Sequence, residues 1–141
     1  GYPSATDIRI IWSRSGSTNA DVIIQGNTNG AHTVLTRTGA PGFPAVGIDV
    51  KASRIRLSDL AVQGVNRAIL LESNLNATVH GVVVKNAGTG VTAEGAMGTI
   101  VENSAFWNTE WGVSLVNART PALATLTGRR CGSVSGQPMS I

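Results

Sequence analysis

The sequence contains little cysteine, few aromatic residues and few charges. Cys131 is the only cysteine among 141 residues, so packing and hydrogen bonds, rather than an internal disulfide, must hold the fold. No apolar run approaches the roughly 18 residues of a membrane-spanning helix. Neither an initiator Met nor a signal-like segment opens the chain, so we expect a mature or excised piece without a membrane partner.

Charge of either sign is also sparse, at 13% of the chain, and the net charge is +3. The basic residues are scattered and only Arg129 and Arg130 are adjacent, which argues against nucleic acid as a partner and still permits an acidic polysaccharide. His32 and His80 have no partners at metal-ligand spacing, and neither a phosphate-binding loop nor a nucleophile elbow is present. These absences exclude the commonest enzyme motifs.

Gly, Val, Ile, Thr, Ser and Asn are abundant, which favours strands and tight turns, and one pattern recurs along the chain. Similar segments start at intervals of 21, 22 and 22 residues (68−47, 90−68, 112−90), namely at Gly47, Ala68, Gly90 and Gly112. A second series has intervals of 22 and 22, with starts at Leu60, Val82 and Ser104. A weaker third series comprises Ile55 and Leu57, Ala77 and Val79, Thr99 and Val101.

A unit this short cannot enclose a core alone, whereas stacked units can, because each strand then pairs with its copy about 4.8 Å away. We therefore predict an all-β protein: a right-handed single-stranded parallel β-helix, or solenoid, with coils of about 22 residues. It forms a single domain over residues 1–141, with the repeats clearest over 47–118. The predicted buried ladders are Ile48, Ile69, Val91 and Val113, then Val50, Leu71, Ala93 and Leu115, and finally Leu60, Val62, Val82, Val84 and Phe106.

Both ends of the chain depart from this pattern. Residues 22–26 look like a copy of residues 60–64 at an interval of 38 (64−26), which places a loop insertion at about 31–45. Residues 7–12 would open the first coil, and the atypical terminal segment 119–141 would form an incomplete coil or a cap. Since neither end shows a capping helix, we expect a fragment of a larger protein or a homo-oligomer.

The segments SGSTNADVIIQGN (15–27) and NGAHTVL (29–35) resemble the opening coils of secreted bacterial pectate-lyase-like β-helix proteins. The repeats over 47–64 and 86–108 are similar to the generic repeats of the same superfamily. The resemblance implies a secreted or cell-surface protein that binds or cleaves an acidic polysaccharide, with calcium held by an Asp cluster and a Lys or Arg as base. No Asp cluster occurs here, so activity of a polysaccharide lyase-like or glycoside hydrolase-like kind stays open.

One outward column of the first series carries candidate chemistry. Glu72 and Glu94 should lie about 5 Å apart on consecutive coils, close enough to hold a cation jointly. We expect Lys51, Glu72 and Glu94 to be catalytic, Asp49 to bind substrate, and the two glutamates to ligate calcium. The alternative is a solvated face with a Lys–Glu cross-strand pair worth less than about 1 kcal/mol.

A second group of candidates lies near one turn. Trp107 and Lys85 share an outward column and Trp111 follows closely, so exposed indoles beside a cation could stack on a sugar. The alternative is that the tryptophans cover a loop or a neighbouring subunit. An outward apolar stripe of Ala61, Val83 and Ala105 supports a competing hypothesis, a non-catalytic structural or adhesion module, such as a surface-protein or phage-fibre fragment, that oligomerises through its outer faces.

Overall fold

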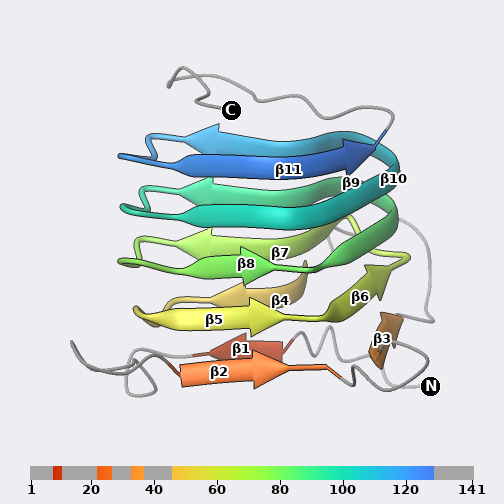
Figure 1. Cartoon of the computed structure of the whole chain (residues 1–141), viewed down its shortest axis with the longest axis horizontal. Coiled ribbons are helices and arrows are strands. Elements are labelled where there is room, and N and C mark those ends of the chain that lie inside the picture. The colour runs from red at the N-terminus through yellow and green to blue at the C-terminus, as the bar shows by residue number, and fades with distance from the viewer. Residues whose placement is uncertain (1–7, 11–21, 27–32, 37–45, 129–141) are drawn as a thin grey trace.

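The computed structural model describes residues 8–10, 22–26, 33–36 and 46–128. These residues form a parallel β-solenoid of about four turns, with no helix in the described ranges (Figure 1). Every strand pairs in parallel with its copy in the next coil, and the regular copies lie 21 or 22 residues apart. The predicted fold class is confirmed.

The described residues contain eleven strands: β1 (Ile8–Ile10), β2 (Val22–Gln25), β3 (Thr33–Thr36), β4 (Val46–Val50), β5 (Ile55–Ser58), β6 (Leu60–Gln63), β7 (Arg67–Glu72), β8 (Thr78–His80), β9 (Val83–Glu94), β10 (Ile100–Val116) and β11 (Ala122–Gly128). They form three walls. The first wall consists of β1, β4, β7 and the ends of β9 and β10. The second wall consists of β2, β5, β8 and the starts of β10 and β11.

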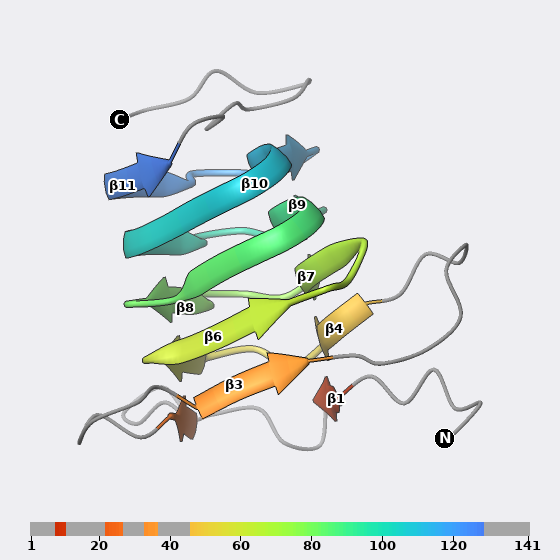
Figure 2. The ribbon, with the colours of Figure 1, turned by 90° about the vertical axis from the view of Figure 1, so that its right-hand side faces the viewer.

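The third wall consists of β3, β6, the start of β9, the middle of β10 and the end of β11. Figure 2 shows β6 and the long strands β9 and β10 stacked in this wall. Because β9 and β10 continue from one wall into the next, residues on different walls of one coil are held by unbroken backbone.

The core lies between the walls and is made of the residues that recur with the 22-residue period. Ile69 is in register with Ile48 on one side and Val91 on the other, and all three are buried. The ladders predicted from the sequence are confirmed, and among the described residues Phe106 is the largest fully buried side chain. Burying such apolar side chains gives about 1.5–3 kcal/mol each, which is the main stabilisation of a fold without disulfides.

The corners between the walls repeat with the same period. Positive φ angles occur in columns one coil apart, at Arg54, Asn76, Gly98 and Thr120, at Asp59, Gly81, Asn103 and Thr125, at Gly64, Asn86 and Asn108, and at Ser73, Gly95 and Asn117. In the third column the Asn108 Nδ2 amide donates to Asn86 Oδ1 at 2.7 Å. Asn tolerates the left-handed conformation, and here its side chain bonds to its copy in the next coil.

The first coil is assigned differently from the prediction. Val22–Gln25 pairs with Ile55–Ser58 in the second wall, not with Leu60–Gln63, whose partner is Thr33–Thr36. Strand β3 thus lies inside the segment predicted as a loop insertion. The physical reason is that strands of all three walls share the same sequence pattern, in which apolar and polar residues alternate and a glycine follows. The pattern therefore identifies a strand but does not tell to which wall the strand belongs.

The extra residues of this coil are spread over several connections. The starts of β2 and β3 lie 11 residues apart (33−22), against 5 for β5 and β6 (60−55). At the other end, β11 lies inside the atypical terminal segment and continues the ladder on β10, while residues 129–141 lie outside the described part. Within the described part, no helix is long and apolar enough to span a membrane.

Candidate functional site

The first wall holds the predicted column of charges. Lys51 Nζ lies 3.4 Å from Glu72 Oε2, and Glu72 is in register with Glu94. The second carboxylate has its own cation, because Arg67 Nη1 donates to Glu94 Oε1 at 3.2 Å. Arg67 was not among the residues singled out from the sequence. Each glutamate therefore faces a basic side chain from another coil, an arrangement that matches the cross-strand pair considered as the alternative.

The middle column of this outer face is nearly inaccessible to solvent. Leu70 and Thr92 occupy the column of Asp49 and are only 6% and 4% exposed although they point away from the core. Asp49 itself is partly buried. Across the described ranges no group of three or more His, Cys, Asp or Glu residues is arranged to hold a metal ion. Calcium binding by Glu72 and Glu94, and catalysis by them with Lys51, stay predictions.

The third wall carries the predicted aromatic group. Trp107 is in register with Lys85, and Lys85 with Gln63, so the indole and the ammonium stand one coil apart on the outer face. Trp111 is in register with Thr89 near the bend into the first wall. The two tryptophans are 40% and 38% exposed, and both are among the most exposed large apolar side chains described.

Between this group and the second wall runs the predicted apolar stripe. Ala61, Val83 and Ala105 are in register on three coils and are half-buried. The stripe is confirmed as a column on the outer surface. It separates the aromatic row from a polar row that the sequence interpretation missed.

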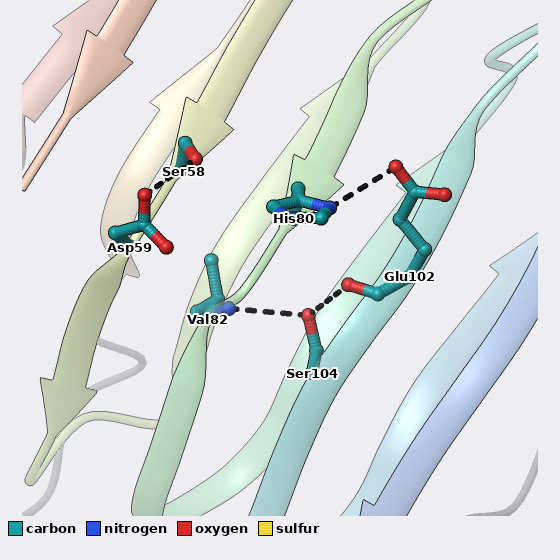
Figure 3. A network of polar contacts seen from close by, with 6 residues as sticks. All are labelled: Ser58, Asp59, His80, Val82, Glu102 and Ser104. Carbon is teal, nitrogen blue, oxygen red and sulfur yellow. Dashed lines mark hydrogen bonds and ion pairs between the residues drawn. The ribbon is translucent and has the colours of Figure 1, made fainter. Parts of the chain in front are cut away.

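The missed row lies on the second wall, where Ser58, His80 and Glu102 are in register on three successive coils. Figure 3 shows His80 between Glu102 and the Ser58–Asp59 pair. His80 Nδ1 lies 3.1 Å from Glu102 Oε1, and both side chains are partly buried. Ser58 Oγ donates to Asp59 Oδ2 at 3.0 Å, and Gln25 Nε2 donates to the same oxygen at 3.1 Å.

The backbone of Glu102 is fixed from the neighbouring corner. The Val82 N–H donates to Ser104 Oγ at 3.2 Å, and Ser104 Oγ donates to the carbonyl of Glu102 at 2.9 Å (Figure 3). A side chain thus replaces a backbone acceptor where the ladder turns. The Glu102 carboxylate beside His80 is therefore attached to a backbone that hydrogen bonds hold in place.

The 22-residue period contains the signal that would have revealed this row. Ser58, His80 and Glu102 are separated by 22 and 22 residues (80−58, 102−80), the interval used to align the core. Metal-ligand spacing along the chain does not reveal this row, because residues close in sequence are seldom spatial neighbours in a solenoid.

Comparisons with protein-family models, with curated proteins and with solved structures each found no match. The functional argument therefore rests on the geometry of the outer faces.

Proposed function

We propose that the protein is a secreted or cell-surface β-helix module, pectate-lyase-like in kind, that binds an acidic polysaccharide on its third wall. The observation that carries the proposal is the pair of half-exposed indoles, Trp107 and Trp111, on a rigid wall with Lys85 one coil away. Tryptophan combines a large apolar face with a polar N–H and is enriched at binding interfaces for that reason.

The chemistry of these side chains suits an anionic sugar. An indole offers a flat apolar surface for the C–H face of a sugar ring, while its N–H and the Lys85 ammonium offer hydrogen bonds and charge. Lys85 has no carboxylate partner among the described residues, so its charge is available to a ligand. Lys85 is paired on both sides, and β10 is paired with β9 at Trp107 and Trp111, so the backbone that holds these groups is ordered before a ligand binds.

Titration calorimetry with polygalacturonate, alginate and a glycosaminoglycan tests the proposal. We expect one of them to bind, and Trp107→Ala or Trp111→Ala to weaken its binding at least about tenfold, a loss of about 1.4 kcal/mol. Lys85→Gln should weaken binding less and make it less sensitive to salt. Ile23→Ala, at an exposed apolar side chain on the second wall, is the matched control. The proposal fails if none of the polymers binds or if the tryptophan variants bind as well as the control.

The second candidate is the structural or adhesion module. The observation that favours it is a cluster of exposed apolar side chains where the first wall turns into the second: Leu75 and Met97, which bridge consecutive coils, and Ile100. Light scattering tests it, because an oligomer that Leu75→Ser or Met97→Ser converts to monomer would favour assembly through this corner. A monomer at all concentrations would exclude it.

A further inference from the structure

We propose that the two ends of the solenoid bind each other, so that copies of this chain stack head to tail along one axis. This inference goes beyond the proposed function, because it concerns the ends of the stack and not its outer walls. Figure 1 shows β1 and β2 at one end of the stack and β11 at the other. The partner is a second copy of the chain, whose last described coil pairs with the first coil of its neighbour.

The first coil has a backbone edge with no strand partner in the described ranges. Strand β2 ends the order of the sheet and pairs only with β5. The N–H of Val22 donates to the carbonyl of Arg54 at 3.0 Å. Because the N–H groups of a strand point alternately to its two sides, the N–H of Ile23 points away from β5, towards the open end. Such a group needs an acceptor, which water or another strand can supply.

The apolar core is also incomplete at this end. Val22 occupies an inward position, since it is in register with Ile55, which is 1% exposed. Val22 itself is 39% exposed, and its neighbour Ile23 is 59% exposed. Burial of apolar surface gives about 25 cal/mol per Å². A further coil stacked on β2 would therefore add apolar burial as well as backbone hydrogen bonds.

The last described coil presents a matching edge at the other end. Strand β11 pairs with β10 and with no other described strand. The Ala122 N–H donates to the carbonyl of Thr99 at 2.9 Å, so the N–H of the next residue, Leu123, points away from β10. The Leu123 side chain is in the core, in register with Val101. This end thus offers a strand edge above an apolar layer.

A head-to-tail contact continues the walls without changing their pattern. All strands of the second wall are parallel, so β11 of one copy meets β2 of the next in the same direction. One inward column of this wall is apolar throughout: Ile24, Leu57, Val79, Val101 and Leu123. Placing Ile24 of the second copy next to Leu123 of the first keeps the column apolar across the junction.

The end strands carry little of what usually keeps sheet edges apart. Native proteins protect such edges with charged side chains, especially lysine, and with proline. Strands β2, β3 and β11 read VIIQ, TVLT and ALATLTG, without a charge or a proline, and β1 contributes only Arg9. The inner strands of the same second wall carry Arg56, His80 and Glu102. Because the two ends differ, the contact is heterologous and builds an open stack rather than a closed dimer.

Light scattering over a range of protein concentrations measures the assembly. We expect the molar mass to rise continuously with concentration, because each added copy exposes a new free end. Val22→Lys and Leu126→Lys each place a charge at a core-facing position of one end strand, and each should weaken self-association at least about tenfold. Ile23→Lys and Ala124→Lys put the same charge on outward positions of the same strands and should still assemble.

Mixing the two blocked variants separates contact between ends from any other contact. Val22→Lys keeps the end at β11 and Leu126→Lys keeps the end at β2, so an equimolar mixture should form pairs of chains and nothing larger. Leu75→Ser, at the apolar corner, should assemble like the full chain. Circular dichroism spectra that match the full chain establish that each variant is folded.

Three results overturn the proposal. The first is a full chain that stays monomeric at all concentrations. The second is assembly that persists in both blocked variants or is lost only in Leu75→Ser, which would assign the contact to the corner. The third is a mixture of folded blocked variants that remains monomeric. The calorimetric test of polysaccharide binding is decided separately, since the tryptophans and Lys85 lie on the outer face of the third wall.

Discussion

Replacing Asn86 tests whether the corners of the coils, and not only the apolar ladders, hold the stack together. Asn86 has φ of 52° and accepts a hydrogen bond from Asn108 at 2.7 Å. Gly64 occupies the same position one coil earlier with φ of 73°. The two roles of Asn86, backbone conformation and side-chain bond, can therefore be removed separately by alanine and glycine.

The expected losses follow from the two contributions. An L-residue with a Cβ costs roughly 1–2 kcal/mol in the left-handed region, a cost that Asn reduces by local hydrogen bonding and that glycine avoids. The side-chain bond is exposed to solvent, so its loss costs about 0.5 kcal/mol, the low end for a hydrogen bond. Asn86→Ala should thus lose at most about 1.5–2.5 kcal/mol, and Asn86→Gly should be more stable than the alanine variant by about 1 kcal/mol.

Urea unfolding followed by circular dichroism measures both variants, with the midpoint reporting stability and the slope reporting the exposed surface. The slope should stay constant, since neither change alters the surface exposed on unfolding. If glycine is as destabilising as alanine, the conformational explanation is wrong and the hydrogen bond carries the effect. If neither variant loses stability, the corner column does not contribute to the stacking of the coils.

Two further substitutions test the packing in the same assay. Gly90→Ala would place a methyl group against the buried ring of Phe106 and the backbone carbonyl of Gly112, so we expect a loss of about 1–3 kcal/mol; an unchanged midpoint would show that both the ring and the neighbouring coil can shift. Ser104→Ala removes the acceptor of the buried Val82 N–H, and a loss of about 1–3 kcal/mol should appear together with faster amide exchange at Val82. Slow exchange at Val82 in this variant would mean that the amide finds another acceptor.

The fold could be predicted from the sequence because the same physical requirement recurs in every coil. A position such as Ile48, Ile69 or Val91 must be apolar in each copy, since its side chain meets only the copies above and below and the interior. Several such series with one period identify the solenoid. The turn position of Asn86 and Asn108 was predictable for the same reason, because the corner demands a left-handed residue in each coil.

The first coil could not be assigned in the same way. Its strands are separated by longer connections, so the 22-residue interval that identifies a wall is lost at Val22 and Thr33. Without the interval, only the alternation of apolar residues remains, and alternation is common to all walls. The mispairing of 22–26 with 60–64 follows directly from that loss.

Outward-facing positions do not have to carry the same kind of residue in every coil. For this reason the row of His80 could not be predicted as easily as the charged column. The charged column could be predicted because Lys51, Glu72 and Glu94 are all ionisable and recur at the coil period. In the structure each of the two carboxylates is paired with a cation. His80 has a serine and a glutamate as its copies, which share no chemical type. Ser58, His80 and Glu102 are recognised as neighbours only when the 22-residue register is applied without regard to residue type.

The arrangement of the two outer groups also constrains how a ligand would lie. Lys85 follows His80 by five residues and Trp107 follows Glu102 by five, so each coil carries one member of the polar row and one of the aromatic row. The corner residues Gly81 and Asn103 and the apolar stripe residues Val83 and Ala105 lie between them. A polysaccharide that touched both rows would therefore run around the coil rather than along the stack, with the apolar faces of its rings on the stripe. Binding would then depend on the same two coils, whereas the outer face of the first wall carries the ion pairs of Lys51 with Glu72 and of Arg67 with Glu94.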